Sequence, residues 1–420
     1  MKYNRTEISD KIGFSSVTDP KFKTNLLTVR FITSLCRETA SANSLGIGVL
    51  SDANSKFKTI AELSEKLSSL YGSGVRSSSS KRGDLQILSF SSSWINNKYA
   101  FDGENLDEEM TEIIKDCIFY PNVSNGEFDS ELFKITKKEL LDRIDAELNN
   151  KRGYAISKAE EIAFRGEPAA LSDMGKKEDA EKVTSADAYR AYQNILRTAQ
   201  IEIMYVSSEE NNIVKNMFTE EFSKIERQPK EYVFNSKSPV KPEIEISSEE
   251  MDVRQCKMVM TFKTDSDDRF ALQMLSMIYG ATPVSKLFAN VREKMSLCYY
   301  CTSRFSSVKN IIMVDSGVEK VNIEKAKAEI LNQLDEIIKG NISDEEINSA
   351  LLSLDNAYNA IGDTPSSYSS WYFERFCNGK ILTPQEQFMN FQNVTKARIV
   401  QAASTLKLDS IYYMLNKEAE

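Results

Sequence analysis

The chain has 420 residues, 41% of them hydrophobic, which is enough apolar material for two cores of ordinary size. Its 53 Lys and Arg are interleaved with 62 Asp and Glu, and the resulting net charge of -9 argues against a nucleic-acid partner. The sequence contains no histidine, which excludes Ser-His-Asp and Cys-His nucleophile systems and ordinary His-based zinc sites.

The amino-terminal sequence MKYNRTEISDKIGF lacks the apolar core of a signal peptide, and no window approaches the length of a membrane span. Six cysteines are scattered without the spacing of a disulfide framework, which indicates reduced thiols. We therefore expect a cytoplasmic chain with no membrane partner. Cys298 and Cys301 form a C-x-x-C in an expected strand, where residues three apart point to opposite faces, so we interpret them as structural rather than as a redox or zinc pair.

The first part of the chain predicts the order strand, helix, helix, strand, strand, several helices, strand. Leu27, Val29 and Phe31 alternate as in a half-buried strand. Thr59 and Glu62 form a capping box at the start of a helix that ends at a glycine. After a polar start, the expected segments are a strand at 26–31, helices at 38–50 and 59–72, two strands joined at 81–84, a helix at 105–121, a charged helical region at 127–164 broken near 151–153, a helix from 185 and a strand at 201–206.

Three of the nine prolines, Pro229, Pro239 and Pro242, fall in one polar stretch that is typical of a linker. The same order of elements then repeats. The expected segments are a strand at 256–262, helices at 267–279 and from 284, strands after 297 and at 311–315, long helices capped by Ser343 with Glu346 and by Thr383-Pro384 with Glu386, and a strand at 411–415.

One stretch of sequence occurs twice. Glu65–Lys81 and Glu293–Lys309, offset by 228 residues, are identical at eight of seventeen positions. We therefore predict an α+β fold of two homologous halves, each a mostly antiparallel sheet backed by helices and related by a pseudo-two-fold duplication. The expected ranges are 1–228 for the first half, 229–245 for the linker and 246–420 for the second half.

Two segments resemble a known family. LFANVREKMSLCYYCTSRFSS, preceded by Gly280 and Ser285-Lys286, is similar to the C-terminal half of pitrilysin or insulinase-type zinc metallopeptidases, and LSDMGKKEDAEKVTSADAYRAYQNIL is similar to the segment before the last strand of their first half. At the helix-to-strand junction this family carries an Arg and, seven residues on, a Tyr. The matching positions here are Arg292 and Tyr299.

The metal site of this family is missing from the chain. The family's inverted His-x-x-Glu-His motif aligns with residues that cannot bind zinc or act as a general base, namely Ser44, Leu45, Gly46, Ile47 and Gly48. The third ligand would come from 139–147, where Asp142, Asp145 and Glu147 are available. Carboxylates without imidazole partners form a poor zinc site, so we predict no metal in this chain.

The resemblance implies a function in trans. In two-subunit members, one chain lacks the metal motif but keeps the Arg and Tyr, and its partner holds the zinc. We expect a non-catalytic, peptide-binding subunit of a heterodimeric processing peptidase, inactive alone, that presents Arg292 and Tyr299 to peptide at the partner's metal and can pair with itself when isolated. A guanidinium can hold a substrate carboxylate or carbonyl, and a phenol can donate to an oxyanion.

The sequence also allows other interpretations of these two residues and of the whole chain. Arg292 can instead be a helix-end charge and Tyr299 a strand aromatic, because the first copy has Tyr71 but carries Ser64 at the position of the Arg. A one-residue bulge would exchange Tyr299 and Tyr300. The chain can also be a structural or assembly protein on the same fold, or, with least support, a self-contained enzyme based on carboxylates or Lys.

Overall fold

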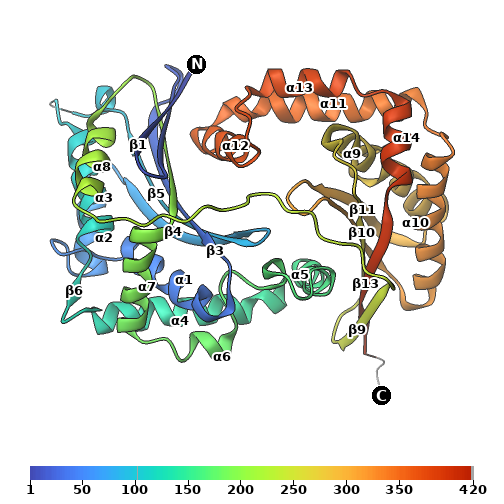
Figure 1. Cartoon of the computed structure of the whole chain (residues 1–420), viewed down its shortest axis with the longest axis horizontal. Coiled ribbons are helices and arrows are strands. Elements are labelled where there is room, and N and C mark those ends of the chain that lie inside the picture. The colour runs from blue at the N-terminus through green and yellow to red at the C-terminus, as the bar shows by residue number, and fades with distance from the viewer. Residues whose placement is uncertain (102, 418–420) are drawn as a thin grey trace. The chain divides into compact units, whose positions relative to one another are not determined.

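The computed structural model describes residues 1–101 and 103–417, which group into two compact units (Figure 1). Each unit is discontinuous in sequence. Unit 1 consists of Met1–Ala146, Leu171–Phe234 and Gly362–Lys380, and unit 2 consists of Glu147–Ala170, Asn235–Ile361 and the chain from Ile381 onward. The described helices all lack the length and apolarity that crossing a bilayer requires.

Unit 1 is built on a six-stranded sheet. Its strands are β1 (Lys2–Ser9), β2 (Ile12–Thr18), β3 (Thr24–Ser34), β4 (Gly74–Arg82), β5 (Leu85–Ile95) and β8 (Gln200–Ser207), with a separate hairpin of β6 (Val123–Ser124) and β7 (Glu127–Phe128). Its helices are α1 (Arg37–Gly48), α2 (Ile60–Ser69), α3 (Leu106–Phe119), α4 (Ser130–Ala146), α6 (Lys177–Ala180), α7 (Ser185–Thr198), α8 (Ile213–Ser223) and α12 (Pro365–Cys377).

Unit 2 is built on a five-stranded sheet. Its strands are β9 (Glu245–Met251), β10 (Cys256–Lys263), β11 (Cys298–Ser306), β12 (Ile311–Val318) and β13 (Lys407–Asn416). Its helices are α5 (Lys151–Ala163), α9 (Arg269–Ser276), α10 (Ile323–Ile338), α11 (Asp344–Ala360), α13 (Pro384–Gln392) and α14 (Lys396–Ser404), together with two π-helical segments, η5 (Met277–Ala281) and η6 (Leu287–Lys294).

The two sheets share one topology. The order β2-β8-β3-β5-β4 in unit 1 corresponds to β9-β13-β10-β12-β11 in unit 2, and in both sheets only the first of these pairs is parallel. The repeated sequence includes most of β4 in one unit and all of β11 in the other, and both are edge strands. The expected α+β fold of two homologous halves is therefore confirmed. The sequence analysis missed β1, β2, β9 and α8, because it treated the amino terminus as a polar start and proposed no elements for the segments holding β9 and α8.

In unit 1 the two faces of the sheet are covered by different parts of the chain. Leu27, Val29 and Phe31 of β3 are buried in the core formed with α1, α3 and α7. The opposite face is covered by α12, which belongs to the second half of the sequence. There the Arg30 guanidinium donates to Ser369 Oγ at 3.1 Å and lies 4.5 Å from the Phe373 ring centroid, and the Tyr372 ring stacks on Tyr3 at 4.0 Å. Burial lowers the pKa of Arg30 to about 10.

In unit 2, a helix from the first half of the sequence covers one face of the sheet. Alternate residues of β10, such as Met258 and Met260, face the core shared with α9, α10 and α14. The opposite face packs against α5, which belongs to the first half of the sequence, through a cluster that includes Ala155, Ala159 and Val259. Both sheets thus need a helix from the other half to cover their second apolar face. The compact units therefore differ from the continuous ranges 1–228 and 246–420 expected from the sequence.

A buried lysine fixes the end of α5. Lys263 is 1% exposed, and its ammonium donates to the carbonyl oxygens of Ala163 at 2.7 Å and Pro239 at 2.8 Å. It also forms an ion pair with the fully buried Asp409 at 3.1 Å. Because a buried charge is stable only when it is paired and hydrogen-bonded, this contact sets the position of α5 on the sheet.

We expect Lys263→Met to lower the free energy of unfolding by about 3 kcal/mol, because it leaves Asp409 buried with only a weaker partner in Lys241. Urea denaturation measures this loss. Adding Asp409→Asn should restore part of it, since the uncompensated charge is removed. Lys257→Met, on the same strand but half-buried, is the matched control. A loss for Lys263→Met no larger than that of the control would contradict this assignment.

Candidate functional site

The helix α1 carries the residues that the sequence analysis aligned with the metal motif of the pitrilysin and insulinase-type peptidases. Ser44 is 5% exposed and its hydroxyl donates to the carbonyl of Asp173 at 2.9 Å. Ile47 is 1% exposed and belongs to the hydrophobic core of unit 1. These two side chains are therefore used for packing and hydrogen bonding inside the unit, and they present no ligand to a cavity.

The two glycines of this segment are sites of close approach. A Cβ at Gly46 would lie 2.7 Å from the carbonyl oxygen of Ala188 on α7. A Cβ at Gly48 would lie 2.8 Å from Cγ2 of Thr136 on α4. Both distances are too short for a carbon atom, so α1 can contact its neighbours this closely only because these positions lack side chains.

A buried glutamine occupies the centre of this region. Gln86 of β5 is fully buried, and its amide group donates to the carbonyls of Ala40 at 3.0 Å and Asp173 at 2.7 Å and contacts Ser44 Oγ at 3.1 Å. Its side-chain oxygen accepts from Asn43 at 2.9 Å. This neutral network connects α1, β5 and the loop before α6. It satisfies the local carbonyl groups without any cation.

The carboxylates of the expected third-ligand region lie on the surface. Asp142, Asp145 and Glu147 are all exposed, and Asp145 pairs with Lys177 at 2.5 Å. Within residues 1–101 and 103–417, no group of three or more Cys, Asp or Glu side chains is arranged to hold a metal ion. The donor set on α1 and α4 does not fit zinc.

Asp52, just after α1, has an unusual environment. Its carboxylate accepts a hydrogen bond from Thr136 Oγ1 at 2.8 Å. Burial raises its pKa to about 6, against the opposing effect of the Thr136 hydrogen bond and with a further rise from Glu139. Folding therefore makes protonation of Asp52 more favourable than it is in the unfolded chain.

Arg292 lies at the surface of unit 2, in the last turn of η6. Its side chain is 42% exposed, its guanidinium carbon is 4.6 Å from the Phe288 ring centroid, and its Nε is 3.9 Å from a carboxylate oxygen of Glu293. The first-half counterpart is Ser64, so this cation is a difference between the two copies. An exposed guanidinium held over an aromatic ring can still bind a carboxylate or carbonyl of a second molecule.

Tyr299 is the exposed tyrosine of the two candidates. It is 63% exposed and its hydroxyl contacts Glu319 at 3.4 Å, whereas Tyr300 is half-buried, with the Arg152 guanidinium 4.4 Å from its ring centroid. The register of β11 against β12 shifts between Cys298 and Tyr300, so Tyr299 is the extra residue of a β-bulge. Among the described residues, no hydrogen bond, ion pair or ring contact joins Tyr299 to Arg292.

The bulge also changes the position of the cysteine pair. Cys298 and Cys301 are both buried in the same core, so the expectation that they point to opposite faces is wrong. Hydrogen bonding to Cys301 lowers the pKa of the Cys298 thiol, and the nearby charge of Arg292 lowers it further, against the effect of burial. All six cysteines are free.

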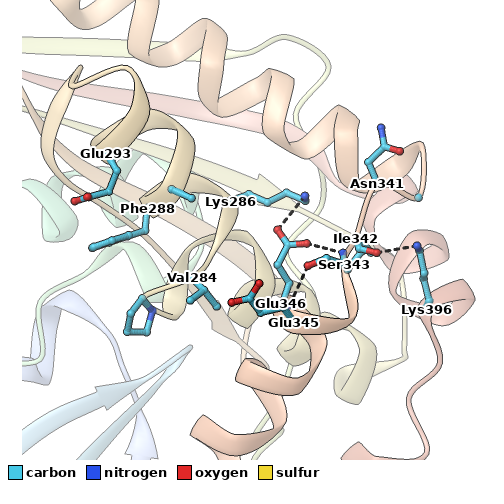
Figure 2. Close-up of a pocket in the computed structure, with 13 residues that line it drawn as sticks. Val284, Lys286, Phe288, Glu293, Asn341, Ile342, Ser343, Glu345, Glu346 and Lys396 are labelled. Atoms are coloured by element: carbon cyan, nitrogen blue, oxygen red, sulfur yellow. Dashed lines mark hydrogen bonds and ion pairs between the residues drawn. The ribbon is translucent and has the colours of Figure 1, made fainter.

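A cavity of about 800 Å³ lies beside η6 (Figure 2). Phe288 and Glu293, the two neighbours of the Arg292 guanidinium, both line it. On its other side, Lys286 pairs with Glu346 at 3.0 Å, and these side chains are 10% and 13% exposed. The remaining lining residues come from the segment that enters α11 and from the start of α14, namely Asn341, Ile342, Ser343, Glu345 and Lys396, with Pro283, Val284, Ala289 and Gly340.

The wall of this cavity is rigid. Ser343 and Glu346 form the expected capping box of α11, and Lys396 donates to the carbonyl of Ile342 at 2.8 Å. Sequence analysis identified the capping box but not the cavity, because Lys286, Glu346 and Lys396 are far apart in sequence. Gln86 was missed for the same reason, since an isolated glutamine in a strand gives no signal of its buried partners.

We expect that restoring the family motif by Ser44→His, Ile47→Glu and Gly48→His produces neither tight zinc binding nor peptidase activity. The side chains would displace the Gln86 network and clash with Thr136, lowering the free energy of unfolding by about 3 kcal/mol or more. Metal analysis after dialysis and urea denaturation measure the two effects. Glu38→His, exposed on the same helix, is the control. A stable variant with stoichiometric zinc would contradict this account.

We expect Asp52→Asn to remove a pH-dependent cost. Because the pKa of Asp52 is raised in the folded state, its stabilising contribution is complete below about pH 4 and is lost as the pH rises through 6. At pH 7 the variant should be about 2 kcal/mol more stable than wild type, and the difference should shrink toward pH 4. Denaturation curves across this range measure it, with the exposed Asp142→Asn as control. Parallel pH profiles for wild type and Asp52→Asn would be inconsistent with the raised pKa.

Comparison with known proteins agrees with this geometry. Residues 182–354 match the family model described as the peptidase M16 inactive domain. The chain is 28% identical over 407 residues to a Bacillus subtilis (strain 168) protein named Probable inactive metalloprotease YmfF, covering 96% of this chain and 95% of that protein.

Two solved structures extend the similarity. A conserved protein from Enterococcus faecalis V583 superimposes with a TM-score of 0.92 at 25% identity, covering 100% of this chain and 99% of that one. The peptidase M16 inactive domain from Pseudomonas fluorescens has a TM-score of 0.80 at 15% identity, with 100% of both chains covered, which shows the fold. The chain is thus similar over residues 182–354 to the peptidase M16 inactive domain, and over nearly its whole length to a protein named as a probable inactive metalloprotease.

Proposed function

We propose that the chain is a non-catalytic, peptide-binding subunit that works in the cytoplasm with a zinc-bearing homologous peptidase subunit, to which it supplies Arg292 and Tyr299. The observation that carries this proposal is the contrast between the two units. The metal positions of unit 1 are filled by Gln86 and by helix contacts, whereas Arg292 in unit 2 remains exposed beside a cavity.

The cavity supports a peptide as the ligand. Its volume of about 800 Å³ is in the range of small-ligand sites and is sufficient for one or two side chains. Phe288 and Val284 offer apolar contact, while Glu293, Glu345 and Lys396 offer charged groups at the rim. A peptide in this cavity would pass the Arg292 guanidinium, because that group lies directly against Phe288 and Glu293.

The exposure of Tyr299 supports a second contact with the substrate. Tyr299 is held away from its own core by the bulge, and its hydroxyl has only a long contact, at 3.4 Å, to Glu319. A phenol in this state can turn to donate a hydrogen bond to a substrate oxygen. The six free cysteines agree with a reducing compartment.

A structural or assembly role on the same fold is the second candidate. It is favoured by Tyr71, the first-half counterpart of Tyr299, whose hydroxyl donates to Glu104 and accepts from the amide of Phe101 at 2.9 Å. Since both tyrosines contact a glutamate beyond the following hairpin strand, Tyr299 can be explained by the duplicated fold alone. Arg292 cannot be explained in this way, because Ser64 replaces it in the first half.

We expect the purified chain to bind no stoichiometric zinc and to have no peptidase activity until the partner, identified by co-purification from the native host, is added. In the reconstituted pair, Arg292→Ala should lower kcat/KM by about tenfold or more, because a charge-assisted hydrogen bond to substrate is lost. Tyr299→Phe tests the phenol in the same assay. Lys294→Ala, exposed two residues further along η6, is the matched control.

Unchanged turnover by the Arg292→Ala pair would remove the role in trans and leave the structural role. A chain that alone holds zinc and cleaves peptide in a chelator-sensitive reaction would contradict both candidates.

A further inference from the structure

The sheet of unit 2 ends in an edge strand, β9, at a place where the sheet of unit 1 has one strand more. In unit 1, β1 pairs antiparallel with β2 along its whole length, so β2 is an inner strand. The corresponding strand in unit 2 is β9, which pairs in parallel with β13 and with no other strand of the described chain (Figure 1). Unit 2 therefore lacks a counterpart of β1 among the described residues.

The free edge of β9 carries unpaired backbone groups. Successive residues of a strand direct their amide and carbonyl groups to opposite sides, so every second residue of β9 turns both groups away from β13. In the part of the chain that the structure describes, the only other backbone hydrogen bond of β9 joins the Met251 carbonyl to the Lys417 amide at 3.0 Å, directly beyond the last residue of β13. An added strand can therefore bond to β9 as β1 bonds to β2.

The two faces of β9 differ in their surroundings. One face packs on α5, where the Tyr154 hydroxyl donates to Glu249 at 3.4 Å. The other face continues the core of unit 2, because Ile246 is in register with the buried Ile411 of β13. Nevertheless, Ile246 is 60% exposed, so the core of unit 2 reaches the surface at this edge.

The comparable edge of unit 1 is covered. Phe14 of β2 is in register with Ile203 of β8, and both side chains are buried in a core to which α8 contributes Phe218. In unit 2, Ile246 and also Ile244, just before β9, are exposed large apolar side chains. They form an apolar surface beside the free backbone edge, of the kind that a further strand covers.

The charges of this edge favour a basic partner. Residues 243–253 include five carboxylates and no Lys or Arg. Two of these carboxylates are held by neighbouring side chains, whereas Glu243, Glu250 and Asp252 are exposed and form no ion pair with any described residue. A second copy of β9 would place like charges opposite one another, which destabilises strand pairing. Charges alone can protect an edge from pairing, but an edge protected in this way has no need of exposed isoleucines.

We propose that the free edge of β9 binds an extended segment of a partner protein, which has an apolar centre flanked by Lys or Arg. The segment adds as an antiparallel strand, as β1 does on β2. Its apolar side chains cover Ile244 and Ile246, and its cations lie opposite Glu243 and Glu250. The surface does not include Arg292 or its cavity, so the inference does not depend on the proposed function.

The test uses the full chain and the fluorescein-labelled peptide Lys-Thr-Val-Thr-Ile-Thr-Val-Lys, whose lysines match Glu250 and Glu243 in an antiparallel register. We expect saturable binding by fluorescence anisotropy and slower amide hydrogen exchange in β9. The same peptide with glutamate at both ends should bind about tenfold more weakly, because like charges then face each other. N-methylation of the peptide amides that face β9 should abolish binding, whereas N-methylation along the opposite edge should not.

Variants of β9 test the side-chain contacts. Ile246→Ser should weaken binding of the lysine peptide about fivefold, because apolar contact is lost. Glu250→Lys should weaken it about tenfold and improve binding of the glutamate peptide. Leu352→Ser, similarly exposed on α11, and Glu38→Lys, exposed on α1, are the matched controls and should leave both affinities unchanged.

The outcomes separate the two parts of the proposal. No saturable binding of the lysine peptide, or binding that N-methylation along either edge leaves unchanged, would overturn β9 as a strand-binding edge. Equal affinity for the lysine and glutamate peptides would overturn the assignment to a basic partner.

Discussion

The hydrogen bonds of Gln86 determine what unit 1 can do. A single neutral amide, fully buried, connects α1 to the loop before α6 at the positions where related peptidases bind metal. Because the amide is uncharged, its burial needs only hydrogen-bond partners, and Asn43, Ser44 and two backbone carbonyls supply them. Zinc would need anionic or imidazole ligands in the same space, and none is present there. The packing of α1 therefore leaves no ligand set for zinc at Ser44, Ile47 and Gly48.

The two glycines of α1 are likewise used for close packing. Gly46 lets α1 approach α7, and Gly48 lets it approach α4, each at a distance that a Cβ would prevent. A helix that holds metal ligands must keep space in front of their side chains. Here that space is closed, so the helix contributes core area in place of a reactive group. The α1 segment of unit 1 is thus used for packing.

Structural features that depend on residues close in sequence were predicted well, and features that depend on contacts between distant residues were not. The capping boxes at Thr59, Ser343 and Thr383 are all present, because a cap depends on residues three apart. The duplication followed from the repeat, whereas the order of the strands within each sheet was not predicted. The exchange of α5 and α12 between the units was not predictable, because it depends on which apolar sheet face remains uncovered. The strands β1 and β2 were missed because residues such as Asn4 and Ser16 are polar and hide the alternation typical of a strand.

For the candidate site, the sequence identified the residues but not their surroundings. Arg292 and Tyr299 were proposed because the resemblance implies an Arg and Tyr pair at these positions, whereas the bulge that exposes Tyr299 depends on how β11 pairs with β12. The bulge has a further consequence, since it turns Cys298 and Cys301 toward one core and brings the Cys298 thiol under the influence of Arg292.

Comparison of the two copies of the repeated sequence shows which features occur only in unit 2. Each copy has an edge strand and a tyrosine whose hydroxyl contacts a glutamate, Tyr71 with Glu104 and Tyr299 with Glu319. Features present in both copies are explained by the shared fold. The guanidinium of Arg292 is present only in the second copy, it is exposed, and its neighbours line the large cavity. A variant at Arg292 therefore tests the proposed function more directly than a variant at Tyr299.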